Sequence, residues 1–190
     1  MYMITEVERT VPIPPKKLSS NIEDVIEEIT EKMFEGSLGE DKALTVLVRD
    51  VQPVGQGRIV HGGECVYQTV RFNQLVFKPK ENEIIQGVVV GVHKYGAFVR
   101  FGPLDGLLHL SQVMDARVNV DEANQRLVEE GENGRSLALG DVVRARVISI
   151  DLNEKNPQES KIGLTMRQPG LGKLQWLEED ARRPRDGGEA

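Results

Sequence analysis

Apolar residues between Glu83 and Arg167 recur in short runs with a period of two, which is the spacing of β-strands. Gly87 and Gly91 interrupt the first run, and glycines inside strands let the backbone bend at the corners of a barrel. The predicted strands are Ile84–Val92, Ala97–Phe101, Gly106–His109, Gly140–Asp151 and Lys161–Met166. The pattern therefore predicts an all-β, five-stranded OB-fold barrel.

A charged segment, Val113–Arg135, separates the third predicted strand from the fourth. We expect an insertion in the barrel, with a short helix around Asp121–Glu130. Acidic side chains, including Glu122 and Glu132, outnumber basic ones in this segment. Outside it the two signs nearly balance, so the barrel is not a strongly basic domain.

The N-terminal part combines one helical pattern with three strand patterns. The apolar residues at helical spacing are Ile22, Val25, Ile26, Ile29 and Met33. Ser20 and Glu23 predict a capping box at the start of this helix, and Glu35–Gly36 predicts its end. The predicted strands are Met1–Val11, Ala43–Val54 and Cys65–Phe77, and the prolines at 12, 14 and 15 are expected to end the first of them. One helix on a small antiparallel sheet is an α+β domain.

These patterns divide the chain into an α+β domain over residues 1–79, a barrel over 80–167 and a C-terminal segment over 168–190. Lys78–Asn82 is the expected linker.

The C-terminal segment predicts a short amphipathic helix, because Leu171, Leu174 and Leu177 are spaced for one face and Trp176 adds an anchor. Arg182–Ala190 is polar and contains glycine and proline, so we expect a disordered tail.

The composition narrows the class of protein. None of the apolar runs among the 190 residues approaches the roughly 20 needed to cross a bilayer, and the start lacks the pattern of a signal peptide. We therefore expect a cytoplasmic protein with no membrane partner. The single cysteine, Cys65, excludes an internal disulfide and a cysteine-cluster metal site, and the three histidines lack metal-ligand spacing, so we expect neither metal nor cofactor. The net charge of −6 disfavours nucleic-acid binding through bulk electrostatics alone.

The first two barrel strands interleave aromatic and basic residues, a pattern that can stack bases and pair phosphates. The aromatic residues are Tyr95, Phe98 and Phe101, in a run that also carries Lys94, Arg100 and His109. Phe101 is the one expected in the core.

The barrel region resembles a known family, the S-one domain, an OB-fold RNA-binding module named after a ribosomal small-subunit protein. The resemblance lies in KYGAFVRFGPLDGLLHLSQ, followed by GDVVRARVISID and KIGLTM. It covers about residues 83–167.

A second resemblance covers nearly the whole chain. It is to the larger stalk component of archaeal RNA polymerase, known as E-prime, whose eukaryotic counterpart is the seventh subunit of RNA polymerase II. The residues that carry it are MYMITEVERTVPIPPKKL, GQGRIVHGGECVYQTVRFNQLVFKPKENEIIQG and MRQPGLGKLQWLEE. One departure is Gly62–Gly63–Glu64, where that family more usually has Gly-Asp-Gly.

The resemblance implies a non-catalytic component that forms a heterodimer with a smaller partner, the F subunit, docks on the polymerase core near the clamp and contacts emerging single-stranded RNA. One alternative is a free-standing S-one RNA-binding protein of translation or RNA decay, which would not require the N-terminal domain. The other is an enzyme such as a nuclease, but no paired carboxylates or histidine constellation support it.

Tyr95 and Phe98 match the S-one positions where bases stack, although Phe98 could instead close the barrel. His109 matches a ligand-facing position, with a hydrogen-bonded rim residue as the alternative. The predicted RNA-binding residues are Lys94, Tyr95, Phe98, Arg100, His109, Arg144, Arg146 and Lys161. For each cation the alternative is a solvated strand face. The near balance of charge predicts modest, salt-sensitive and sequence-tolerant binding.

A glycine-rich segment between residues 55 and 63 lacks the Gly-Lys-Ser/Thr ending of a phosphate-binding P-loop. Hairpin geometry alone could explain it, and the resemblance favours a tip that docks on the polymerase core. The predicted docking residues are Glu35, Gly36, Gly55, Gly57, Arg58, Ile59, Val60, Gly62 and Gly63. We expect Glu35–Gly36 to lie beside the tip.

Overall fold

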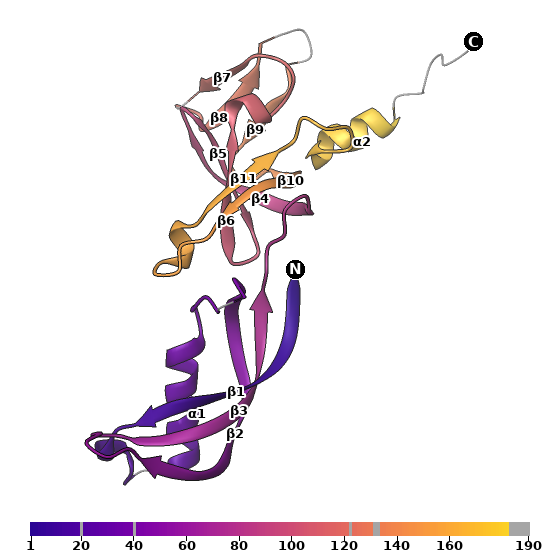
Figure 1. Cartoon of the computed structure of the whole chain (residues 1–190). Helices are drawn as coiled ribbons and strands as arrows, with labels where there is room; N and C mark the ends of the chain where they lie inside the picture. Colours follow the sequence, from indigo (N-terminus) through magenta and orange to yellow (C-terminus); the bar gives the residue numbers. More distant parts are fainter. Residues whose placement is uncertain (20, 40, 122, 131–133, 183–190) are drawn as a thin grey trace. The chain divides into compact units, whose positions relative to one another are not determined.

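The computed structural model describes residues 1–19, 21–39, 41–121, 123–130 and 134–182. The chain divides into two compact units, Met1–Pro79 and Lys80–Ala190 (Figure 1). Within the described residues, no helix combines the length and apolar content needed to cross a membrane.

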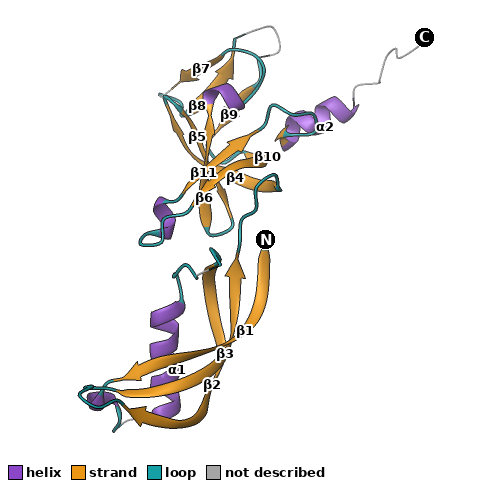
Figure 2. Ribbon diagram, viewed as in Figure 1, coloured by secondary structure: helices purple, strands orange, loops and turns teal. Residues whose placement is uncertain are grey.

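The first unit is a three-stranded antiparallel sheet with one long helix packed on it (Figure 2). Its elements are β1 (Tyr2–Ile13), a 3-10 turn (Pro15–Lys17), α1 (Ile22–Phe34), β2 (Leu44–Ile59) and β3 (Val66–Phe77). The strand order is β1-β3-β2, so β3 is the central strand. The predicted α+β class of this part is confirmed.

The core of the first unit lies between α1 and the sheet. Its buried residues are Val11, Ile13, Val25, Ile26, Val48, Val70 and Phe72. Two residues of the predicted apolar helix face, Ile22 and Met33, are instead exposed, because they lie at the ends of α1. Thr30 is buried in their place, and its hydroxyl donates to the carbonyl of Ile26 at 2.6 Å.

The N-cap of α1 is Asn21, whose side chain accepts a hydrogen bond from the backbone N–H of Glu23. The predicted cap, Ser20, lies outside the described residues. The first strand does not end at Pro12 as predicted, since β1 runs to Ile13. Pro12 is tolerated because β1 is an edge strand. One side of the strand has no neighbour that would need the N–H that proline lacks.

The second unit is a closed five-stranded barrel, which confirms the predicted architecture. Its strands are β4 (Ile84–His93), β5 (Gly96–Phe101), β6 (Leu104–His109), β10 (Val142–Asp151) and β11 (Lys161–Thr165). β11 pairs with β10 on one side and, in parallel, with β6 on the other, and this double pairing closes the sheet.

Closure separates inward from outward side chains along every strand. On β5, Ala97 and Val99 are fully buried, while Phe98 and Arg100, which alternate with them, point outward. On β10, Val143, Ala145 and Val147 are fully buried, as their alternation predicted. The barrel is therefore filled by small and branched side chains, and its outer face is free to carry function.

The insertion between β6 and β10 forms a second small sheet, so the predicted helix around Asp121–Glu130 is wrong. Its strands are β7 (Val118–Asp121), β8 (Arg126–Glu129) and β9 (Ser136–Ala138), after a 3-10 turn (Leu110–Gln112). Asp121 accepts hydrogen bonds from the backbone and side chain of Asn124, which makes a turn where a helix was expected. Glu122 and Glu132 lie outside the described residues.

The C-terminal segment is part of the second unit. A short strand, β12 (Gly172–Lys173), pairs with β10, and α2 (Leu174–Arg182) follows. Leu171, predicted to lie in the helix, precedes it. A 3-10 turn (Pro157–Glu159) lies in the loop between β10 and β11. The predicted disordered tail was Arg182–Ala190; Arg182 is instead the last residue of α2, and residues 183–190 lie outside the described residues.

Trp176 holds α2 in place. It is 8% exposed, and the guanidinium of Arg135 lies over its ring at 5.7 Å while also pairing with Asp180 at 2.5 Å. Near the start of the segment, Lys173 pairs with Asp141 at 2.8 Å. Trp176, predicted to anchor this segment, therefore packs on the protein itself.

Trp176→Ala should lower the free energy of unfolding of the second unit by about 3–5 kcal/mol, the cost of a large-to-small change at a buried tryptophan. Gln175→Ala, on the exposed side of the same helix, is the control and should stay within about 0.5 kcal/mol of wild type. Urea denaturation of both variants measures this, and equal midpoints would show that α2 does not support the barrel.

Candidate nucleic-acid interface and hairpin tip

The turn between β4 and β5 carries a cluster of aromatic rings on the outer face of the barrel. Tyr95 lies in the turn and is 46% exposed, and Phe98 is half-buried on the outward side of β5. Their ring centroids are 6.2 Å apart with nearly perpendicular planes. Phe98 therefore does not fill the barrel, because the inward positions beside it belong to Ala97 and Val99.

A groove of about 520 Å³ runs from these rings across the outer face. Its floor includes Phe98 and Leu107, which face each other across β5 and β6, and Gly163 of β11, which pairs with Leu107. Lys161 lies two residues before Gly163 and lines the same groove. Strands distant in sequence thus bring Tyr95, Phe98 and Lys161 together.

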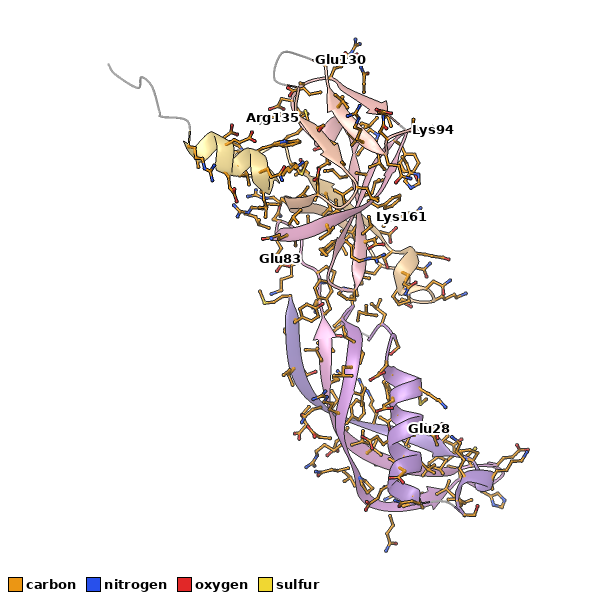
Figure 3. The ribbon with its side chains drawn as sticks, turned by 180° about the vertical axis from the view of Figure 1, so that it is seen from behind. Glu28, Glu83, Lys94, Glu130, Arg135 and Lys161 are labelled. Atoms are coloured by element: carbon orange, nitrogen blue, oxygen red, sulfur yellow. The ribbon has the colours of Figure 1, made fainter. Side chains whose placement is uncertain are left out.

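The cations beside the groove differ in whether they are already paired. Arg100 donates to both carboxylate oxygens of Asp105, at 2.8 and 2.9 Å, and this hydrogen bonding raises the pKa of its guanidinium. Lys94 and Lys161 are exposed, and neither has a carboxylate partner among the described residues. Figure 3 shows both lysines on the side of the second unit away from Arg135. The groove itself therefore offers one unpaired positive charge, that of Lys161, and Lys94 adds a second next to Tyr95, while Arg100 is largely neutralised.

Arg144 and Arg146 lie away from the aromatic cluster. Arg144 and Arg146 pair with Gln86 and Ile84 of β4, whereas Phe98 pairs with Gly91, near the other end of the same strand. Five residues along a strand correspond to about 16 Å. Arg144 is exposed, but Arg146 is half-buried and its Nε is a buried atom without a hydrogen-bond partner. The structure thus does not bring these two predicted residues into the groove.

His109 has a structural role at the end of β6. Its Nδ1 accepts a hydrogen bond from the backbone N–H of Ser111 at 3.3 Å and lies 2.9 Å from the Ser111 hydroxyl, which caps the following 3-10 turn. His109 pairs with Gly96 across β5, so it lies beside the Tyr95 turn. The ring is exposed and only its Nε2 remains available to a ligand.

The connection between β2 and β3 is an exposed hairpin tip in the first unit. Ile59 is 76% exposed and Val60 is 55% exposed. The N–H of Gly63 donates to the carbonyl of Val60 at 2.8 Å, and Gly62 has a φ of +81°, a conformation that favours glycine. Two apolar side chains that contact little of their own unit are consistent with a protein-contact surface.

Gly55 and Gly57 do not lie at the turn, because β2 continues to Ile59. They form a bulge, marked by a register shift between Val54 and Arg58. A Cβ on Gly57 would lie 2.8 Å from Cγ1 of Val66, so any larger residue there would force the Val66 side chain to shift.

The residue that holds this bulge, Gln68, was missed by the sequence reasoning. It is 6% exposed, and its Nε2 donates to the carbonyls of Val54 at 3.2 Å, Gly55 at 3.4 Å and Thr69 at 2.9 Å. The signal was present in the sequence, because Gln68 stands in phase with the buried residues Val70 and Phe72. A polar residue in an apolar phase indicates a buried group with a specific partner.

Glu35 and Gly36 lie at the opposite end of β2 from the tip, so the expectation that they lie beside it is wrong. A carboxylate oxygen of Glu35 accepts from the N–H of Val48 at 2.9 Å, and the N–H of Gly36 donates to the carbonyl of Thr45 at 2.8 Å. Gly36 has a φ of +73°, as expected after a helix end. Both residues join α1 to the start of β2.

Within the described ranges no three His, Cys, Asp or Glu side chains gather as a metal site would require. The two candidate surfaces offer groups suited to contact: ring stacking and charge on the barrel, and apolar side chains on the tip.

Two family matches cover the two units. Residues 8–63 match the SHS2 domain found in the N terminus of Rpb7p/Rpc25p/MJ0397, and residues 78–161 match the S1 RNA binding domain. In this order they define the class of the protein: a non-catalytic subunit of a DNA-directed RNA polymerase.

Similar proteins support this class over nearly the full length. DNA-directed RNA polymerase subunit Rpo7 of Saccharolobus shibatae is 33% identical over 178 residues, covering 93% of this chain and 97% of the relative. Subunit RPC8 of RNA polymerase III of Bos taurus is 24% identical over 200 residues, covering 93% and 98%. Subunit RPB7 of RNA polymerase II of Glycine max is 29% identical over 104 residues, covering 55% and 59%. The chain belongs to the Rpo7 family of RNA polymerase subunits, and the predicted family is confirmed.

Gln68→Ala should cost about 1–3 kcal/mol of unfolding free energy, because part-buried carbonyls at the bulge lose their donor. Gln52→Ala, an exposed position of β2, should change stability by less than about 0.5 kcal/mol. Chemical denaturation of the full chain distinguishes them, and an unchanged midpoint for Gln68→Ala would contradict a role in holding the bulge.

Proposed function

We propose that this protein forms the polymerase stalk with the smaller F subunit, docks on the core near the clamp through its first unit and binds emerging single-stranded RNA with its barrel. The observation that carries the proposal is the outer groove of the barrel, where exposed Tyr95, half-buried Phe98 and unpaired Lys161 lie together. A polymerase component with such a surface is suited to hold a transcript, and we expect it to act in the cytoplasm.

RNA binding follows from the chemistry of the groove. Each stacked base contributes about 1–3 kcal/mol to the binding free energy. The contribution depends little on sequence, since every base has a π-face. Lys94 and Lys161 add phosphate contacts, while Glu159 at the groove limits the total charge. Binding is therefore modest, tolerant of sequence and sensitive to salt.

Docking on the core depends on the hairpin tip. Ile59 and Val60 are apolar yet exposed, at the end of a sheet whose bulge is held by a buried glutamine. Such a tip presents a fixed apolar pair to a partner surface, and Arg58 beside it can contribute a charged contact.

The smaller stalk partner requires a separate surface. The face of the first sheet opposite α1 exposes Ile4 at 76% and has a hollow of about 410 Å³ between Ile4, Leu47 and Leu75. An apolar row of this kind suits a permanent partner. Gel filtration after co-expression of the two proteins tests the pairing, and a stable complex should elute as one heterodimer.

The competing function is a free-standing RNA-binding protein of translation or RNA decay. The near full-length relation to polymerase subunits favours the stalk, because the first unit has no part in RNA binding by a barrel alone. Affinity purification of the tagged chain should recover polymerase subunits, and recovery of ribosomes instead would favour the competitor.

The double variant Ile59→Glu, Val60→Glu should abolish docking on the polymerase core while leaving the melting temperature unchanged, since both side chains are exposed. Met33→Glu, a single change of the same kind at an exposed position of α1, should leave docking intact. Reconstitution of the labelled protein with stalk-less core measures docking, and retention of the tip variant would refute the tip contact.

Lys161→Ala should weaken binding to single-stranded RNA and reduce the slope of log affinity against log salt by about 0.7, the value for one phosphate contact. The control is Arg100→Ala, Asp105→Ala, which removes a neutral pair and should leave the slope unchanged. Anisotropy titrations at several salt concentrations measure both, and identical slopes for Lys161→Ala and wild type would contradict a phosphate contact.

A further inference from the structure

A third ring, that of His93, belongs to the aromatic cluster at the turn between β4 and β5. It was not among the residues that the sequence predicted to bind RNA. We propose that His93 contacts RNA directly and completes the stacking surface made by Tyr95 and Phe98. This inference rests on the proposed RNA binding and adds a residue to that same site.

The ring geometry supports a shared surface. The planes of His93 and Tyr95 are 6° from parallel with centroids 5.5 Å apart, which is an offset stack. Phe98 is the third ring of the cluster. Its centroid lies 5.4 Å from that of His93, and the two ring planes are 84° apart. His93 therefore holds the ring of Tyr95 in one orientation, which reduces the entropy that a stacking base would otherwise have to remove.

His93 is exposed, so its ring is accessible to a ligand. It lies over the backbone of Gly91, where an added Cβ would come 3.5 Å from its Nε2. Packing in the core does not explain it, since the inward positions of this hairpin are filled by Ala97 and Val99.

The ring nitrogens of the two barrel histidines differ in their partners. In the described part of the chain neither nitrogen of His93 has a hydrogen-bond partner, whereas Nδ1 of His109 is engaged by Ser111. His109 thus caps a turn, and His93 presents a free imidazole at a stacking surface. Lys94, the next residue, is an exposed cation that can hold a phosphate while the rings hold the base.

The test is the affinity of the full chain, in complex with the smaller stalk partner, for a fluorescently labelled oligouridylate of about 12 nucleotides, within the site size of one OB fold. His93→Ala should weaken binding by about fivefold or more, the loss expected from one stacking partner. His93→Phe keeps a flat ring and should stay within about twofold of wild type. His61→Ala, an exposed histidine of the hairpin tip, is the matched control and should bind like wild type.

Affinity for His93→Ala equal to wild type would overturn the inference, and so would a His93→Phe variant as weak as His93→Ala. A direct readout that a purely structural role would not produce is the NMR signal of the His93 ring protons in the wild-type chain. These protons should shift when the oligouridylate is added, and no shift would also overturn the contact.

The outcomes separate this inference from the function on which it rests. If the wild-type complex does not bind the RNA, the proposed transcript binding fails and His93 fails with it. If wild type binds and Tyr95→Ala weakens it while His93→Ala does not, only the role of His93 is wrong.

Discussion

Closure of the second sheet, made by β11 pairing with β10 and β6 at once, is the constraint on which the candidate RNA surface depends. In a closed barrel every second side chain must point inward, so the alternate residues form one outer face. Closure sets Lys161 of β11 beside Leu107 and Phe98, although more than 50 residues separate them in sequence. The same constraint leaves Arg144 and Arg146 on another part of that face.

A second constraint acts in the first unit, where a single buried amide organises the long hairpin. Gln68 satisfies backbone carbonyls that the bulge in β2 would otherwise leave unpaired. The bulge lets β2 continue to Ile59, so Ile59 stands on a paired strand and Val60 follows it directly. Both candidate surfaces thus start from ordered strands, which hold the geometry of a site better than loops do.

The sequence was sufficient for elements whose pattern is strong and local. Val143, Ala145 and Val147 alternate cleanly, and α1 and all five barrel strands were predicted from such patterns. It failed in the insertion, where Leu127 and Leu137 are the fully buried residues of strands only three or four residues long. Charged neighbours obscured that alternation, and the turn at Asp121 depends on a side-chain hydrogen bond that periodicity does not encode. For the candidate site, residue types were enough to predict Tyr95 and Phe98. The pairing of Arg100 with Asp105 and the stacking of His93 on Tyr95 arise only when the chain folds, so the sequence pattern did not indicate them.

The short strand β12 has a consequence for how the isolated protein behaves. β11 covers β10 only from Arg146 onward, and β12 covers Val143 and Arg144. A chain that ended at the last barrel strand would leave those N–H and C=O groups unpaired on an open edge, which is a template for strand addition by a second molecule. By pairing with β10 the C-terminal segment removes this open edge, and the ion pair between Lys173 and Asp141 ties β12 to the residue before β10.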